Sequence, residues 1–151
     1  MADQAVKAPT FEHFNQAWVE RVVGSKGKSG IDGFLGIVVT EVSAGRLVAE
    51  MEVTPALMTV MGNMHGGCLS ALCDHVLGTV MYPVMPPKYW AATTEFKINY
   101  LAAVTAGVLD ARARIISLTK RTAVVRIDVE NDGRLVCGAQ GTVLVVAPKA
   151  E

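Results

Sequence analysis

The residues best suited to chemistry gather in one short segment, "HGGCLSALCD", which runs from His65 to Asp74. Asp74 is the only acidic residue in a stretch whose small and apolar side chains predict a helix from about residue 66 to residue 81. A carboxylate buried in such a helix is costly unless it is paired or used. A carboxylate in use can act as a general base on water or as a nucleophile on a carbonyl, and the sequence leaves both roles open.

His65, Gly66 and Gly67 stand where this helix is expected to begin. The first N–H groups of a helix have no partner inside the helix, and they carry the positive end of its dipole. Glycine also lets a substrate approach the backbone closely. We therefore predict that the Gly66 and Gly67 N–H groups form an oxyanion hole, and that His65 orients a carbonyl group or a water molecule.

Helical geometry separates His65 from Asp74. Nine residues of helix rise ~13 Å and rotate by about 900°, which is a net half turn. The two side chains should therefore face opposite ways, so that they cannot converge on one carbonyl within one chain. This spacing predicts sites that combine residues of two chains. Ser70, one turn before Asp74, could hydrogen-bond that carboxylate or the backbone of its own helix.

Alternating apolar and polar residues predict the elements that position this segment. We expect a helix at 10–23, a glycine-rich loop at 24–33, a hairpin at 35–42 and 46–53, the central helix at 66–81, and strands at 90–101, 108–118, 122–131 and 134–146. Short turns make the last strands antiparallel. A helix that is apolar nearly all round must be covered nearly all round. These elements predict an α+β domain in which a curved antiparallel sheet wraps around the central apolar helix.

Composition excludes several classes of protein. The chain has 151 residues, 51% of them hydrophobic, and its 14 Lys and Arg balance its 14 Asp and Glu, so no overall charge attracts nucleic acid or an anionic membrane. Three scattered cysteines indicate neither a disulfide framework nor a metal site, and their expected role is that of small buried apolar residues. The first residues contain no apolar stretch typical of a secretion signal, and Asp74 and His75 interrupt the only long apolar stretch. We therefore expect a cytoplasmic protein with no membrane partner.

The motifs and their order resemble the hotdog fold, and more narrowly the PaaI-type acyl-CoA thioesterase family. Three segments carry the resemblance: "HGGCLSALCD" with its acidic residue nine positions after the His, "TTEFKINYL" at 93–101, and the terminal hairpin "LTKRTAVVRIDVENDGRLVCGAQGTVLV". The resemblance implies a hotdog thioesterase domain at 33–147. An N-terminal helix and glycine-rich loop at 1–32 precede it, and a short tail at 148–151 follows it.

The resemblance also implies an activity and a set of site residues. The expected reaction is hydrolysis of an acyl-CoA thioester, with coenzyme A present only as part of the substrate and with no metal. Thr93 matches a hydroxyl position that helps to hold the water or the acid, and Thr59 stands where relatives carry Asn or Gln. The residues expected to bind coenzyme A are Lys120, Arg121 and Asn63. Relatives place the His-Gly-Gly of one subunit opposite the acid of its neighbour, which implies a homodimer with shared active sites. Whether such dimers pair into a tetramer is left open.

Two other functions remain open at this point. Hotdog proteins also include acyl-CoA hydratases and dehydratases, which pair a His with an acid in a different helix motif. The missing Asn or Gln at position 59 would also suit a non-catalytic dimer that binds acyl-CoA. The identity of the acyl group does not follow from the sequence, because side chains of two subunits would shape its pocket.

Overall fold

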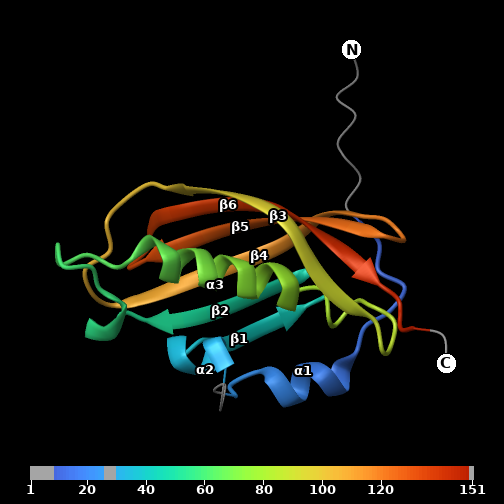
Figure 1. Cartoon of the computed structure of the whole chain (residues 1–151). Coiled ribbons are helices and arrows are strands. Elements are labelled where there is room, and N and C mark those ends of the chain that lie inside the picture. The colour runs from blue at the N-terminus through green and yellow to red at the C-terminus, as the bar shows by residue number, and fades with distance from the viewer. Residues whose placement is uncertain (1–8, 26–29, 150–151) are drawn as a thin grey trace.

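A single antiparallel sheet with a long helix along one face organises the computed structural model, which describes residues 9–25 and 30–149 (Figure 1). The helices are α1 (Gln16–Val22), α2 (Gly30–Leu35) and α3 (Gly66–Thr79), with a short 3-10 turn at Pro55–Leu57. The strands are β1 (Val38–Ser43), β2 (Arg46–Glu52), β3 (Trp90–Tyr100), β4 (Val108–Leu118), β5 (Thr122–Asn131) and β6 (Arg134–Val146).

The sheet has the order β1-β2-β4-β5-β6-β3, and every neighbouring pair is antiparallel. Strand β3 precedes β4 in the chain but lies at the far edge, where it pairs only with β6. Alternate residues of β4 and β5 are buried, as the alternating sequence predicts. The curved antiparallel sheet around a helix confirms the predicted α+β hotdog architecture.

Helix α3 lies along the sheet and buries only one of its faces. The residues that pack toward the sheet are Leu69, Leu72, Cys73, Val76 and Leu77, all at most 4% exposed. On the opposite face, Gly67 and Asp74 are exposed. The prediction that the chain itself covers α3 nearly all round is therefore wrong. The sheet curves around one side of the helix and leaves the other side open.

Gly141 makes the close approach of α3 to the sheet possible. A Cβ atom at this position of β6 would lie 2.5 Å from the Leu77 Cδ1 atom, 2.5 Å from the Phe96 Cβ atom and 2.6 Å from the Glu95 carbonyl oxygen. These distances are far below ordinary van der Waals contact, and one of the three atoms belongs to the backbone. Glycine is therefore required at position 141 by packing.

Gly141→Ala is expected to lower the free energy of unfolding by about 1–3 kcal/mol, because overpacking forces neighbouring groups to move. Gly138 offers a matched control on the same strand, since a Cβ there would find its nearest atom, an Asp128 carboxylate oxygen, at 3.9 Å. Gly138→Ala should change the stability by less than about 0.5 kcal/mol. Urea unfolding of both variants checks this, and equal stabilities would contradict the packing argument.

The first helix is shorter than predicted. Helix α1 begins at Gln16, with the Asn15 side chain accepting a hydrogen bond from the Trp18 N–H at 3.0 Å, and Thr10 is not its cap. The reason is a contact distant in sequence. Phe11 lies against Gly45 in the β1–β2 turn, so closely that its ring occupies the space of a Cβ atom at that glycine. The residues before α1 are therefore not helical, although their apolar spacing is that of a helix.

The glycine-rich loop predicted at 24–33 is wrong in its second half. Residues 30–33 belong to α2, while 26–29 lie outside the residues that the structure describes. In α2 the buried Leu35 anchors the helix to the core, and Asp32 stands in its first turn. Such an acidic residue is favourable at a helix N-terminus. The glycines at 30 and 33 led to the prediction of a loop where the structure has a helix.

Candidate active site

The His-Gly-Gly motif forms the N-terminus of α3, as predicted. His65 is the N-cap residue, and its Nδ1 atom accepts a hydrogen bond from the Gly67 N–H at 2.9 Å. A Cβ at Gly67 would lie only 2.9 Å from the same Nδ1 atom, so a side chain there would displace the imidazole. The Gly66 N–H has no partner among the described residues. The two predicted oxyanion donors thus differ. The Gly67 N–H is bonded to His65, whereas the Gly66 N–H is free among the described residues.

Tyr100 holds the start of α3 to the sheet, and sequence reasoning missed it. Its hydroxyl donates to the Gly66 carbonyl oxygen at 3.0 Å and shares a second hydrogen bond with the Ser70 hydroxyl at 2.6 Å. A Cβ at Gly66 would press on the tyrosine ring at 3.2 Å. Ser70 thus bonds neither Asp74 nor its own helix, and both expectations for it are wrong. The alternation of 93–101 predicts that Tyr100 lies on the helix side of β3, but it does not indicate a partner for the hydroxyl.

Asp74 lies on the open face of α3 and is exposed. It forms no hydrogen bond or ion pair with His65, Thr59 or Thr93, all of which the structure describes. The expectation that Asp74 is buried within its own chain is therefore wrong. An exposed carboxylate carries no desolvation cost. The cost of burying a charge is therefore no argument, within the isolated chain, that Asp74 has a function.

Thr59 and Asn63 form a small hydrogen-bonded loop directly before the motif. The Thr59 hydroxyl donates to the Asn63 side-chain oxygen at 3.1 Å, and the Thr59 N–H donates to the Asn63 carbonyl at 2.7 Å. The Asn63 amide N–H donates in turn to the Met64 carbonyl at 3.2 Å. An amide group therefore stands beside position 59, although it comes from a residue four positions later in the chain.

A hollow of about 420 Å³ opens in front of α3. It is lined by Asn63, Met64, Gly66, Leu69, Tyr100 and the residues 101–104 that follow β3. The half-buried Gly66 and the exposed Tyr100 stand at this hollow, so the free Gly66 N–H lies beside accessible space. The volume is within the range of roughly 300–1,000 Å³ that is common for small-molecule sites.

The remaining predicted residues lie away from this hollow within one chain. Thr93 pairs with the buried Val143, which puts it on the helix side of the edge strand β3, where it is exposed. Lys120 and Arg121 are exposed in the β4–β5 turn. That turn follows the C-terminal end of β4, whereas α3 begins near the segment before β4, where the Met64 N–H bonds the Val104 carbonyl at 2.8 Å. The eleven residues of β4 separate the two ends by roughly 36 Å.

His75 lies beside the site on the adjacent side of α3. It lines a separate hollow with Trp18 and Tyr82, whose rings stack at a centroid distance of 6.0 Å. Burial lowers the pKa of the His75 imidazole, and the charges of Asp32 and Asp74 partly oppose this shift. This placement agrees with the interpretation of His75 as a packing residue.

Acidification is expected to destabilise the fold through His75. Because its folded-state pKa is lowered from about 6.5, the unfolded chain binds a proton more readily, and stability falls as the pH drops below that value. His75→Gln should flatten the loss of stability between about pH 7 and pH 5.5, whereas the same change at the exposed His13 should not. Thermal melts across this range test the expectation. Identical pH profiles of wild type and His75→Gln would contradict it.

The cysteines are free, and two of them are buried as predicted. The sulfur atoms of Cys73 and Cys137 lie 3.9 Å apart between α3 and β6, and their hydrogen bond together with burial raises the pKa of the Cys73 thiol. Cys68 is half-buried. Within residues 9–25 and 30–149, no group of three His, Cys, Asp or Glu residues is arranged to hold a metal ion, and no helix is long and apolar enough to cross a membrane.

Comparison with known proteins points to one family. The sequence model of the thioesterase superfamily matches residues 61–138, which is just over half of the chain and includes the whole motif. A 1,4-dihydroxy-2-naphthoyl-CoA hydrolase from Listeria monocytogenes is 28% identical over 117 residues, which are 77% of this chain and 95% of the relative.

Two solved structures share the fold. A mutant of the phenylacetic acid degradation protein PaaI from Thermus thermophilus is 31% identical with a TM-score of 0.68, over 74% of this chain and 94% of that one. A hypothetical thioesterase protein from Streptococcus pneumoniae, solved with coenzyme A, is 28% identical with a TM-score of 0.69, over 76% of this chain and 88% of that one.

Proposed function

Since the chain belongs to the thioesterase superfamily and is a thioester hydrolase with the hotdog fold, we propose that it hydrolyses an acyl-CoA to a free carboxylic acid and coenzyme A. The observation that carries this proposal is the free Gly66 N–H beside a hollow at the start of α3, with the exposed Asp74 two turns along the same helix. The coenzyme A in the pneumococcal relative supports the choice of thiol.

The proposed chemistry uses these groups in order. The Gly66 N–H donates to the thioester carbonyl oxygen and stabilises the negative charge that develops on it. The Gly67 N–H joins it when the His65 imidazole turns away from the backbone toward the substrate. The Asp74 carboxylate takes a proton from the attacking water, a C–O bond forms, the C–S bond breaks, and the proton passes to the departing thiolate.

The nucleophilic route remains the second possibility for Asp74. In that route the carboxylate itself attacks the carbonyl, the thiolate leaves, and water then hydrolyses the resulting anhydride. A single turnover in ¹⁸O-labelled water tests the nucleophilic route. Label in the Asp74 carboxylate shows that water cleaved an anhydride at the Asp74 carbon, whereas label in the acid product arises from water attack on the thioester or on the acyl carbon of the anhydride.

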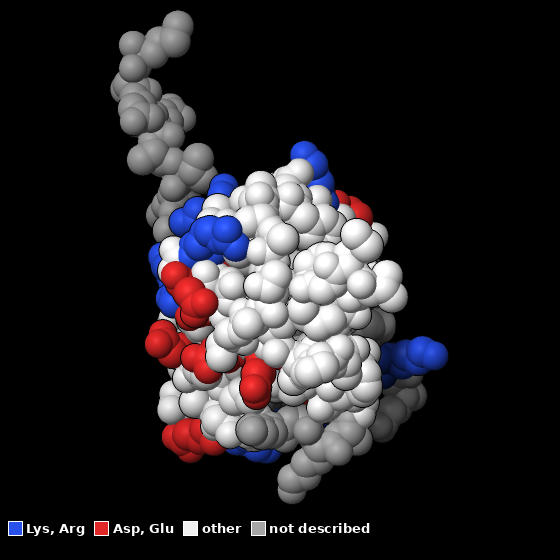
Figure 2. All heavy atoms as spheres, turned by 90° about the vertical axis from the view of Figure 1, so that its left-hand side faces the viewer, with Lys and Arg blue, Asp and Glu red and all other residues white. Residues whose placement is uncertain are grey.

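We further propose that two chains share each site. Within one chain, Asp74 does not contact His65, and the edge strand β3, which pairs with β6 on one side, has its other edge unpaired among the described residues. The end of the molecule at which α3 begins has few charged residues on the helix side, while charges gather along the side of the outer sheet face (Figure 2). The exposed apolar residues near this end include Val60, Met61, Tyr100 and Leu101. A second copy would cover them and complete the site.

The shared site would also give the remaining residues a role. Lys120 and Arg121 lie too far from the Gly66 of their own chain, but a second chain can bring a different helix start close to them. We propose that they bind coenzyme A phosphates there. Thr93 would hold the water or the Asp74 carboxylate, and the Thr59–Asn63 pair would present its amide where relatives carry Asn or Gln.

A thiol-release assay over a panel of acyl-CoAs tests this function. The panel begins with aryl-CoA thioesters, since two relatives are named for a naphthoyl-CoA and for phenylacetic acid degradation, and continues with straight chains of increasing length. Release of free coenzyme A with at least one substrate is the expected result. Crotonyl-CoA hydration, measured in parallel, should be absent. Hydration without thiol release would replace the thioesterase by a hydratase, and binding without turnover of any substrate would refute the catalytic proposal.

A further inference from the structure

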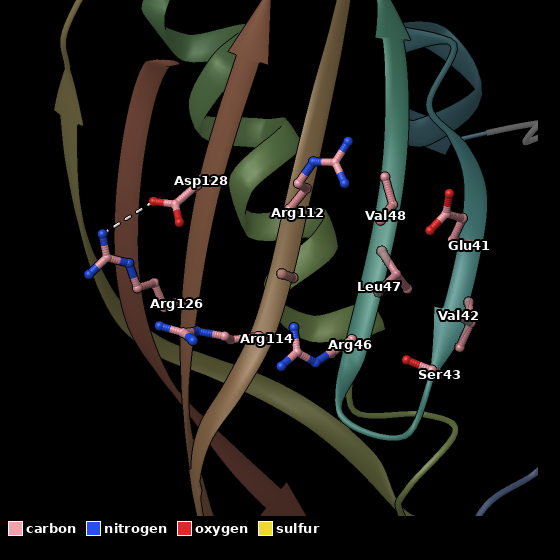
Figure 3. A pocket seen from close by; sticks show the side chains of 11 residues that line it. Glu41, Val42, Ser43, Arg46, Leu47, Val48, Arg112, Arg114, Arg126 and Asp128 are labelled. Atoms are coloured by element: carbon pink, nitrogen blue, oxygen red, sulfur yellow. Dashed lines mark hydrogen bonds and ion pairs between the residues drawn. The ribbon is translucent and has the colours of Figure 1, made fainter. Parts of the chain in front are cut away.

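The sheet face that points away from α3 carries a row of basic side chains. The strand register aligns Arg46 of β2 with Arg114 of β4, and Arg114 with Arg126 of β5. The row continues through Gln140 of β6 to Lys97 of β3. Because neighbouring strands lie roughly 4.8 Å apart, the backbones at Arg46 and Arg126 are separated by only about 10 Å. Figure 3 shows these arginines coming from adjacent strands, with α3 behind the sheet.

Two arginines of this row have no acidic partner. Arg126 pairs with Asp128 at 3.4 Å, and Arg112, one step along β4, pairs with Asp110 at 2.7 Å. Neither Arg46 nor Arg114 forms an ion pair with any residue in the described part of the chain, and both are exposed. Like charges directly opposite each other weaken a sheet. Any polar residue would suit these solvent-facing positions, so the fold itself gives no reason for the row.

The row borders two adjoining hollows on this face. The larger hollow, of about 470 Å³, is lined by four arginines and two carboxylates, namely Arg46, Arg112, Arg114 and Arg126 with Glu41 and Asp128. The smaller hollow, of about 250 Å³, shares Arg126 and Asp128 with it and is lined further by Asn99, Leu101 and Leu135. Gly138 faces outward in the smaller hollow, and the lack of a side chain there keeps it open. A basic compartment thus adjoins a more apolar one.

From this arrangement we infer a nucleotide site on the outer face of the sheet, with a di- or triphosphate on Arg46, Arg114 and Arg126 and the base in the smaller hollow. A guanidinium group can bind two phosphate oxygens at once. Arginines on strands about 5 Å apart can therefore contact successive phosphates of one ligand. The exposed Leu135 offers apolar contact to a flat ring, and the Asn99 amide offers hydrogen bonds to its edge. The Asp128 carboxylate can accept a bond from a ribose hydroxyl.

The inferred nucleotide site and the proposed catalytic site lie on opposite faces of the sheet, and Leu101 at the end of β3 borders a hollow of each. The sheet separates the outer face from α3, and Arg46, Arg114 and Arg126 all alternate with buried residues that point toward the helix. The chemistry has two sources, a free nucleotide and the adenosine 3′-phosphate 5′-diphosphate end of coenzyme A. The first would make the outer face a separate binding site. The second would make it a contact of the substrate's own tail, in place of the Lys120 and Arg121 of the proposed function.

Isothermal titration with ATP, ADP, inorganic triphosphate and adenosine tests the inference. ATP should bind more tightly than ADP, and adenosine should not bind. The double variant Arg46→Gln/Arg114→Gln should weaken ATP binding at least about tenfold, because it removes two charge-assisted contacts, whereas Arg21→Gln on α1 should leave it unchanged. The double variant should keep or raise the melting temperature, since it relieves the repulsion, so a folding defect would be recognised.

Kinetics with two substrates separates the sources. If the KM of an acyl-CoA rises in the double variant while that of the matching acyl-pantetheine is unchanged, the nucleotide is the end of the substrate. If ATP binds and both KM values stay constant, it is a free ligand. The inference fails if ATP does not bind below about 1 mM at low salt, or if Arg21→Gln weakens binding equally. It also fails if sedimentation shows that the double variant dissociates a larger oligomer, because the row is then a contact between copies.

Discussion

Asp74→Asn is expected to lower kcat for thioester hydrolysis by about 10²- to 10⁴-fold, because the amide can neither accept the proton of the attacking water nor attack the carbonyl. The side chain keeps its size, and Asp74 makes no contact within its own chain that the change would break. The free energy of unfolding should therefore change by less than about 0.5 kcal/mol. Thiol release at saturating acyl-CoA measures the effect.

Glu12→Gln is the matched control, since Glu12 is an exposed carboxylate outside every helix and strand, and it should leave kcat unchanged. Asp74→Glu keeps the charge but moves it by one methylene, and it should recover part of the activity. Cleavage by Asp74→Asn at the wild-type rate would remove Asp74 from the reaction. It would then leave the membership in the thioesterase family intact while overturning the assignment of the base.

Mixing two inactive variants, His65→Ala and Asp74→Asn, is expected to restore about a quarter of the wild-type activity. If each site takes His65 from one chain and Asp74 from the other, half of the randomly assorted dimers contain one chain of each kind. One of the two sites in such a dimer is intact, and the other carries both changes. The measurement is thiol release after the variants are mixed, partly unfolded and refolded together.

Each variant refolded alone supplies the baseline, and it should stay inactive. A second control mixes Asp74→Asn with the double variant His65→Ala/Asp74→Asn, in which no pairing of chains can bring an intact His65 and an intact Asp74 together. Its activity should equal the baseline. Recovery in neither mixture would mean that both residues act within one chain, which the exposed and separate positions of the two side chains in the isolated fold argue against.

Strands β2 to β6 were predictable almost to the residue because their signal is local, whereas β1 begins three residues later than predicted, since Leu35 belongs to α2. In β4 and β5, most alternate residues are apolar and buried, and short turns join β4 to β5 and β5 to β6. The His65 cap of α3 was equally local, since glycines directly after a polar residue mark a helix start. The prediction of the first helix failed because a contact between residues distant in sequence determines the local structure. Phe11 has helical spacing with Phe14 and Trp18, but its ring packs on Gly45, and the segment before α1 is not helical.

The site was predictable in its motif and not in its surroundings. The place of His65 at the start of α3 and of Asp74 within that helix follows from the apolar pattern and the glycines of the motif. The exposure of Asp74 does not, because it depends on how far the sheet curves around α3. Tyr100 illustrates the same limit, since no pattern within β3 indicates that its hydroxyl reaches the backbone of Gly66, 34 residues earlier. Side chains that act across elements depend on the tertiary arrangement.

The position of β3 in the sheet has a consequence for synthesis on the ribosome. Strand β3 is made before β4, β5 and β6, yet its only partner is β6, the last strand of the chain. Until β6 has been made, both edges of β3 therefore stay unpaired. The apolar side of α3 is also incompletely covered during this time. The sheet closes only when β6 has left the exit tunnel. Nascent chains that stop before residue 134 should expose β3 to proteases and chaperones, while β1, β2, β4 and β5 can already pair.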